Sequence, residues 1–299
     1  MPASALRLAV LGCGLVLAVP AGAADYGLYG EAVWWRLVPP GGGAESEIVG
    51  TFHVVDPALE PAIERALARL DAIGALIVEV DMDAAATALP PRMLLPEDTS
   101  LSAILGDTDY AEVAAVAAEY GLTDAALQRL APWAVTLIIT PPVEQYARMQ
   151  AGALPFDYRL LDAAVQAGLP VATLETVEEQ AAAFVGASEG DQVALLMQTV
   201  ALHDDAPALI DAMLGRYVAG DLAALATAGV EAMRSADPAA TARILAGLID
   251  DRNRRMAGRL APLLAERPYL VAIGALHLPG EAGVLALLAA KGWGVEPIP

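Results

Sequence analysis

The chain has 299 residues, of which 37 are Asp or Glu and only 17 are Lys or Arg, so its formal net charge is −20. A negative field of this size repels nucleic acid and anionic lipid, and it excludes functions that depend on binding polyanions. It also favours cations, including divalent metals, near a pocket, although solubility alone is the simpler explanation of the overall charge.

The first 24 residues resemble a secretory signal peptide. Arg7 is their only charge, an apolar stretch runs from Leu8 to Val19, and Ala21-Gly22-Ala23 offers a cleavage site. Almost no apolar region precedes Cys13, the only cysteine, which argues against lipoprotein processing there. We therefore expect residues 1–24 to be a cleaved leader and the protein to be exported, periplasmic or extracellular; an uncleaved N-terminal anchor is the alternative. No later apolar run reaches about 18 residues, so no membrane span is expected in the mature chain.

The mature N-terminal region predicts a strand–helix–strand unit. After the turn material of residues 39–43, Ile48 to Val55 is predicted to be a strand, and Ala58 to Asp71 has apolar residues at helical spacing. Ala75 to Asp81 is a short aliphatic run, typical of a buried parallel strand. Trp34 and Trp35, which precede this unit, could serve an interface, although the sequence does not determine the oligomeric state.

The centre of the chain is predicted to be mostly helical. One further strand, Pro170 to Leu174, ends in Glu175, and Thr176 with Glu179 matches a capping box that starts the next helix. Helices are expected at about 108–120, 123–131, 156–167, 189–203, 206–219, 222–234 and 238–265.

The C-terminus repeats the plan of the N-terminus, with a strand from Tyr269 to Ile273, a helix over 281–291 and a final strand from Trp293 to Ile298. We therefore predict an α/β fold whose mixed central sheet is built from N- and C-terminal strand–helix–strand units. Residues 25–299 would form a single domain, with a large helical insertion at about 84–165 and 177–266.

Two of the three histidines stand in the same four-residue frame, Gly50-Thr51-Phe52-His53 and Gly274-Ala275-Leu276-His277. Each frame closes a predicted strand and is followed by a proline-marked turn and a helix. The glycine would let the backbone turn tightly and bring the imidazole inward. If the two ends of the chain fold together, both imidazoles meet at one site.

Ligands of open α/β sheets collect at the carboxyl ends of the strands, where His53, Glu79, Glu175 and His277 are expected. Glu79 interrupts an aliphatic strand, so it should bind either a cation or, as the alternative, backbone amides or an arginine. His53, His277 and Glu79 together would leave coordination positions free for water and substrate, as a catalytic metal site requires. Nitrogen and oxygen ligands suit Zn²⁺, Mn²⁺, Co²⁺ or Fe²⁺.

Three arginines, Arg252, Arg255 and Arg259, share one face of the predicted late helix. They could simply pair with neighbouring acids, or one of them could orient Glu79 or Glu175 or clamp a substrate carboxylate. The remaining histidine, His203, lies at a predicted helix end and is expected at the surface.

The chain resembles the TraB/GumN family, which includes the Tiki proteins and is related to erythromycin-esterase and ChaN-like proteins. The resemblance covers nearly the whole mature chain in order. It rests on Gly50-Thr51-Phe52-His53 with Asp56-Pro57, Ile77-Val78-Glu79-Val80-Asp81, Leu174-Glu175-Thr176-Val177-Glu178-Glu179-Gln180, Arg252-Asn253 and the run from Val271 to Val284. It implies ligands or catalytic groups at His53, Glu79 and His277, with Glu175 and Arg252 nearby, and Tiki members are described as metal-dependent proteases.

The leading hypothesis is an exported metal-dependent hydrolase, peptidase-like, acting on a peptide or small molecule that the sequence does not identify. Glu175 would move a proton of the attacking water, and Arg252 would stabilise the oxyanion. Two alternatives stay open at this point: a protein that binds a metal or haem without turnover, and an interaction protein with a vestigial site.

Overall fold

The computed structural model describes residues 26–234 and 237–299. The predicted signal peptide, with Arg7 and Cys13, therefore lies outside the described residues. Within them, the structure has no helix of the length and apolarity that a bilayer crossing needs.

Six strands form one mixed sheet in the order β4-β3-β5-β2-β1-β6. They are β1 (Trp34–Val38), β2 (Ser46–Thr51), β3 (Leu76–Val78), β4 (Val171–Thr173), β5 (Leu270–Gly274) and β6 (Gly294–Pro297). The four strands from β4 to β2 run parallel, whereas β1 is antiparallel to both β2 and β6. This confirms the predicted α/β class and the joining of the two ends of the chain in one sheet.

The register aligns the carboxyl ends of the parallel strands. Thr51 at the end of β2 is opposite Gly274 at the end of β5. Val78 at the end of β3 is opposite Thr173 of β4 on one side and Ala272 of β5 on the other. The residues that follow these strands therefore emerge along one edge of the sheet, where parallel sheets bind their ligands.

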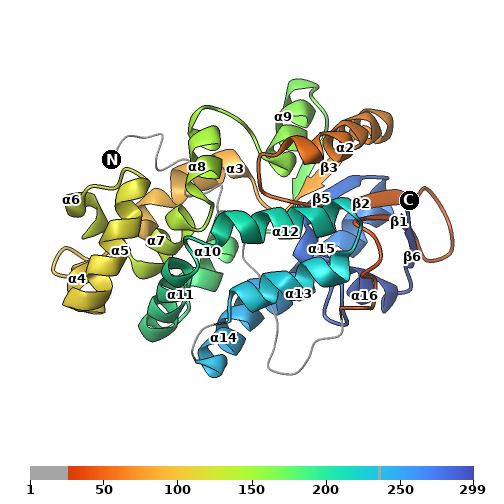
Figure 1. Cartoon of the computed structure of the whole chain (residues 1–299). Helices are drawn as coiled ribbons and strands as arrows, with labels where there is room; N and C mark the ends of the chain where they lie inside the picture. Colours follow the sequence, from red (N-terminus) through yellow and green to blue (C-terminus); the bar gives the residue numbers. More distant parts are fainter. Residues whose placement is uncertain (1–25, 235–236) are drawn as a thin grey trace.

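Helices flank the sheet on both faces. On one side α2 (Glu60–Ile73) packs against α9 (Phe156–Gln166), and α15 (Asp251–Glu266) and α16 (Val284–Ala289) pack together across the sheet from them (Figure 1). Helix α2 ends at Gly74, whose φ of 75° gives the left-handed turn that leads into β3.

Two of the remaining helices, α12 (Ala206–Val218) and α13 (Leu222–Ala232), lie beside the strand ends, and others extend away from the sheet (Figure 1). The remaining helices all lie in or next to the predicted insertion, to which α9 and α15 also belong. The remaining helices are α3 (Met82–Ala88), α4 (Leu101–Leu105), α5 (Asp107–Glu119), α6 (Asp124–Leu127), α7 (Pro132–Ile139), α8 (Val143–Gln150), α10 (Val177–Val185), α11 (Glu189–Ala201), α12, α13 and α14 (Pro238–Leu245).

Some predicted boundaries were wrong. The helix expected over 123–131 ends at Leu127, and the fully buried helix α7 that follows was not predicted. Because every residue of α7 is buried, its sequence lacks the polar face that marks a surface helix. The long helix expected over 238–265 is interrupted by a π-helical turn, Ala246–Asp250, between α14 and α15.

Trp34 and Trp35 belong to the core, so their expected role in an interface is wrong. They lie in β1, a strand that the sequence did not predict, and are only 3% and 1% exposed. Their indole N–H groups donate to Glu47 Oε2 at 3.0 Å and to the Ala32 carbonyl at 2.8 Å. The large apolar rings are thus buried and their polar atoms satisfied within this chain.

The capping box at the start of α10 is confirmed. Glu179 N–H donates to Thr176 Oγ1, and the Glu179 carboxylate accepts from Thr176 N–H at 2.9 Å. The same carboxylate accepts two hydrogen bonds from Arg259 at 2.6 and 2.7 Å. The arginine, followed by the cap, lowers the pKa of Glu179 to about 2.

This pKa predicts how Glu179 contributes to stability as the pH changes. Because the folded pKa lies below the ordinary value of 4.5, the contribution is complete above about pH 4.5 and is lost as the pH falls through 2. Urea unfolding should therefore show that Glu179→Gln destabilises the protein clearly at pH 6 and much less at pH 3. Glu178→Gln is the matched control, because Glu178 pairs only with exposed Arg92 and should give a small effect at both pH values. An equal loss of unfolding free energy for Glu179→Gln at both pH values would contradict the lowered pKa of Glu179.

Candidate functional site

Both framed histidines and Glu79 meet at the carboxyl edge of the sheet. His53 lies two residues beyond β2, His277 closes a short turn after β5, and Glu79 directly follows β3. Around the position that a Cβ on Gly274 would take, Glu79 Oε1 lies 3.2 Å away, His53 Nε2 3.3 Å and His277 Cδ2 3.5 Å. All three side chains are buried. The convergence that the repeated frame predicts is therefore present.

The two glycines of the frames allow neighbouring segments to lie close to the backbone and do not form tight turns. The expectation that they turn the backbone is therefore wrong. Neither has a positive φ, and both lie in regular strands. A Cβ on Gly50 would lie 2.8 Å from Ala275 Cα, whereas a Cβ on Gly274 would fill the space among the imidazoles and Glu79. The first glycine brings the two frames into contact, and the second keeps the centre open.

His53 is held by a carboxylate from the insertion. Its Nδ1 lies 3.0 Å from Oδ1 of Asp157, in the first turn of α9, so Nδ1 carries the proton and the lone pair lies on Nε2 of the neutral ring. His53 Nε2 is buried and has no hydrogen-bond partner. Burial opposes a charge on His53, but Asp157 and Glu79 outweigh it and raise the pKa of the imidazole.

His277 is held in the same way by an amide. Asn253 Nδ2 donates to the Ala282 carbonyl at 2.9 Å, which fixes the amide and leaves Oδ1 to accept from His277 Nδ1 at 2.7 Å. Burial, aided by the charge of Arg252, lowers the pKa of His277 to about 3, so the ring is neutral and its lone pair lies on Nε2. This nitrogen lies 3.8 Å from Glu79 Oε1.

Glu79 has the partners that the sequence allowed for a buried glutamate. Its Oε1 accepts from Gly274 N–H and its Oε2 from Arg252 Nη2, both at 2.6 Å. Burial alone would raise the pKa of Glu79, but Arg252 and the other partners lower it to about 2. The carboxylate is thus ionised at neutral pH. The strand ends at Val78, so Glu79 does not interrupt it as expected but is the first residue beyond it.

Glu175 lies one step further from the imidazoles, on the other side of Arg252. Its Oε2 accepts from Arg252 Nε at 2.7 Å and its Oε1 from Arg255 Nη1 at 2.6 Å, so both oxygens are bound to arginines. Arg252 itself is buried and binds both glutamates. All three arginines of the predicted face pair with acids, as the simpler alternative held, and Arg252 in addition binds and so orients both Glu79 and Glu175.

His203 lies outside this centre, and its expected place at the surface is wrong. Its side chain is only 10% exposed, and its Nε2 lies 3.3 Å from Glu119 Oε1.

The donor set at the centre suits a divalent metal, although the carboxylate is engaged elsewhere. His53 Nε2, the edge of the His277 ring and an ionised carboxylate oxygen surround one space, and each imidazole is fixed through Nδ1, as metal-binding histidines usually are. Nevertheless, no three His, Cys, Asp or Glu side chains within residues 26–234 and 237–299 form a ready-made metal-binding cluster. Both oxygens of Glu79 accept hydrogen bonds, one from Arg252 and one from Gly274 N–H. Because the pKa of His53 is raised, a proton on its imidazole could neutralise part of the carboxylate charge in place of a metal.

Sequence reasoning missed the two residues that hold the imidazoles. Asp157 resembles an ordinary first-turn acid of a helix, and its only distinctive signal is burial, which a single sequence does not show. Asn253 directly follows Arg252 on α15, and its part in the family resemblance was the one available signal.

The role of Gly274 predicts that Gly274→Ala should destabilise the protein by about 1–3 kcal/mol in urea unfolding, because the new methyl group would lie 3.2–3.5 Å from Glu79, His53 and His277 and crowd them. The imidazole NMR resonances of His53 and His277 should shift as well. Gly258→Ala is the matched control, since Gly258 lies in α15 with nothing within 4 Å of its added Cβ. Alanine there should be neutral or stabilise the helix by up to about 1 kcal/mol. If Gly274→Ala changed neither the stability nor the histidine resonances, the close packing of Glu79, His53 and His277 around Gly274 would be refuted.

Comparison with known proteins supports the same architecture. The model of the TraB/PrgY/gumN family matches residues 33–297, from β1 to β6. The uncharacterized protein YbaP of Shigella flexneri is 26% identical over 256 residues, covering 83% of this chain and 89% of the relative, and YbaP of Escherichia coli (strain K12) gives the same values. No solved structure matches the chain. Since the family match spans both histidine frames and every strand of the sheet, the chain belongs to the TraB/PrgY/gumN family.

Proposed function

We propose that the protein is an exported, metal-dependent hydrolase of the peptidase type, with a divalent metal held by His53, His277 and Glu79. One observation carries the proposal: Glu79 Oε1, His53 Nε2 and His277 Cδ2 all lie within 3.5 Å of the point that a methyl group on Gly274 would take, and His277 Nε2 lies 3.8 Å from Glu79 Oε1. Two lone pairs and a carboxylate repel one another unless a cation or a proton lies among them. Export is supported only by the leader pattern of residues 1–24.

The residues around the space determine which metal they could hold. Asp157 and Asn253 each accept a hydrogen bond from the Nδ1–H group of a histidine, so His53 and His277 would bind the metal through Nε2. Glu79 would bind it through Oε1. Such nitrogen and oxygen donors suit Zn²⁺, Mn²⁺, Co²⁺ or Fe²⁺. A divalent metal in this position supplies Lewis acidity and lowers the pKa of a water molecule.

The protein's own groups then divide the remaining work. Glu79 is ionised, and its Oε1 would bind the metal while Arg252 holds its Oε2, so Glu79 would not also take the proton of an attacking water. Glu175, to which the sequence assigned that proton, is better suited to positioning, since arginines occupy both of its oxygens. Arg252 keeps a positive charge next to Glu79, where it would favour negative charge developing on a substrate.

The ligand assignment predicts the metal content of purified protein. After dialysis against Zn²⁺ or Co²⁺, the wild-type chain should retain about one metal ion by elemental analysis, because catalytic sites commonly use three protein ligands. The double variant His53→Ala, His277→Ala should retain almost none. His203→Ala is the matched control, since it removes the third histidine at a distant place and should leave the metal content unchanged.

Circular dichroism should first show that each variant is folded. A folded double variant with wild-type metal content would rule out His53 and His277 as ligands.

The hydrolase assignment predicts cleavage of peptide bonds by metal-loaded protein. A mixture of synthetic peptides incubated with the Zn²⁺, Mn²⁺, Co²⁺ or Fe²⁺ form should give cleavage products by mass spectrometry. Glu79→Gln should slow cleavage at least about 100-fold, because it replaces a charged metal ligand with a neutral amide. Glu178→Gln, at an exposed position on α10, should leave the rate unchanged. Stoichiometric metal without cleavage of any peptide would instead indicate a metal-binding protein without peptidase activity.

A further inference from the structure

The two imidazoles of the centre are held by groups of different charge. His53 Nδ1 lies 3.0 Å from Oδ1 of Asp157, a carboxylate, and His277 Nδ1 lies 2.7 Å from Oδ1 of Asn253, a neutral amide. A carboxylate that accepts from one nitrogen of an imidazole fixes the ring and makes the other nitrogen a stronger electron-pair donor. The two rings are therefore held in the same way but are unequal as ligands, with His53 Nε2 the stronger donor.

Asp157 reaches His53 from a helix that is fixed by its own contacts. It lies in the first turn of α9, where a helix favours negative charge. The residue before it, Phe156, is fully buried. Arg159, half a turn later, donates to both carboxylate oxygens of Glu60 on α2, at 2.6 and 2.7 Å. Packing and this ion pair together hold the Asp157 carboxylate in a defined place beside the ring.

Water competes little with the contact between Asp157 and His53. The two side chains are only 11% and 7% exposed, so their hydrogen bond lies in a medium of low polarity. His53 Nε2 is buried as well and has no hydrogen-bond partner. It lies 3.3 Å from the point that a Cβ on Gly274 would take, and Glu79 Oε1 lies 3.2 Å from the same point. The hydrogen bond on Nδ1 thus directs the unpaired nitrogen toward the space next to Glu79.

We propose that Asp157 is a positioning residue through which the helical insertion sets the metal affinity of the centre. It keeps the proton of His53 on Nδ1, so that Nε2 is available to a ligand, and its charge makes this nitrogen a stronger donor than that of His277. The role in metal affinity rests on the proposed function, whereas the hold on the imidazole is a property of the metal-free protein. The two can therefore be measured separately.

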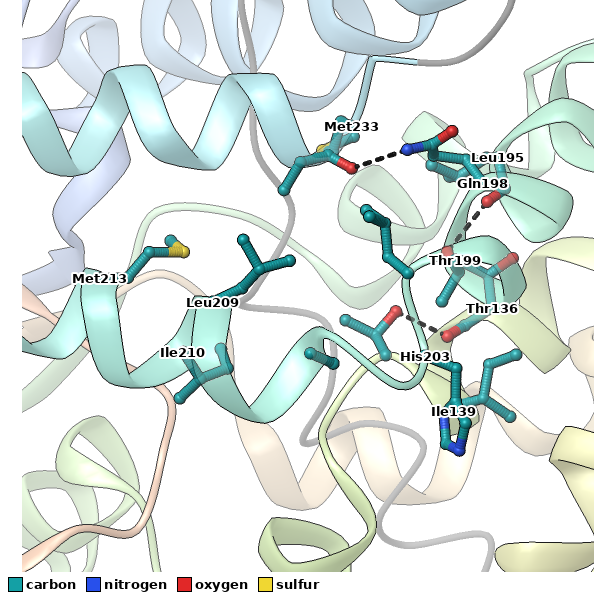
Figure 2. Close-up of a pocket in the computed structure, with 14 residues that line it drawn as sticks. Thr136, Ile139, Leu195, Gln198, Thr199, His203, Leu209, Ile210, Met213 and Met233 are labelled. Atoms are coloured by element: carbon teal, nitrogen blue, oxygen red, sulfur yellow. Dashed lines mark hydrogen bonds between the residues drawn. The ribbon is translucent and has the colours of Figure 1, made fainter.

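The metal-free protein tests the hold on the ring. In protein with ¹⁵N-labelled histidine at about pH 9, well above the ordinary pKa of an imidazole, His53 and His277 should both carry the proton on Nδ1. His203, which lies beside an apolar cavity of the insertion (Figure 2), is the internal reference, since its Nε2 faces a carboxylate oxygen of Glu119 and should carry the proton. Asp157→Ala should move the proton of His53 to Nε2 or divide it between the two nitrogens. Asp157→Asn, which can still accept, should leave it on Nδ1. An unchanged tautomer of His53 in Asp157→Ala would overturn the proposal.

The affinity for Zn²⁺, measured by competition with a chelator, tests the consequence. It should fall about 100-fold in Asp157→Ala and about tenfold in Asp157→Asn, which keeps the hydrogen bond but loses the charge. Asp162→Asn is the matched control, because it removes the same charge at an exposed position of α9 and should leave the affinity unchanged. Equal affinity of Asp157→Asn and the wild-type protein would overturn the role of the charge. Wild-type protein that binds no Zn²⁺ would refute the proposed function and with it the role of Asp157 in metal affinity, while the tautomer of His53 would still decide the hold on the ring.

Discussion

The buried ion-pair cluster around Arg252 determines how the candidate site is built. Arg252 on α15 binds Glu79 after β3 and Glu175 after β4, and all three side chains are buried. Removing buried charges from water is costly, and breaking such a cluster leaves an uncompensated charge in the core. The arrangement therefore fixes the late helix against the carboxyl ends of two strands that lie far away in sequence. It also keeps Glu79 ionised beside His277, whose pKa is lowered, and His53, whose pKa is raised.

The π-helical turn before α15 accompanies this arrangement. Ala246–Asp250 widens the helix just ahead of Arg252, whose Nη1 lies 3.4 Å from the Leu248 carbonyl within that turn. Such turns are frequent at functional sites, because one additional residue in a turn changes the directions of the side chains that follow. Here Arg252 reaches the glutamates while its neighbour Asn253 holds His277. One short segment of helix thus positions both the carboxylate and an imidazole.

Much of the site could be predicted from sequence because it depends on rules of strand ends and helix spacing. His53, Glu79, Glu175 and His277 each lie at or near the carboxyl end of a predicted strand, and the ends of parallel strands meet at one edge of a sheet. Arg252, Arg255 and Arg259 lie on one helical face by their spacing alone.

The features that escaped prediction depend on burial or on distant pairing. Helix α7 is enclosed by the core, and β1 begins with two adjacent buried tryptophans, so neither shows a recognisable alternation of apolar and polar residues. Asp157 contacts His53 across 104 positions of sequence, and no local pattern encodes that contact. The roles of Gly50 and Gly274 could not be predicted either, because the atoms that would contact an added Cβ come from other segments of the chain.

The helical insertion takes part in the site and does not merely cover it. Asp157 of α9 fixes the ring of His53, and Tyr217 of α12 donates to the Gly50 carbonyl at 2.6 Å and stacks on Phe52, the residue before His53. Met213, one turn earlier on α12, lines a cavity between α7, α11, α12 and the end of α13 (Figure 2). The first histidine frame is therefore held from two sides by helices of the insertion. A displacement of α12 would act on the Gly50 carbonyl and the Phe52 ring before it reached the imidazole, so packing in the insertion and geometry at the centre are physically connected.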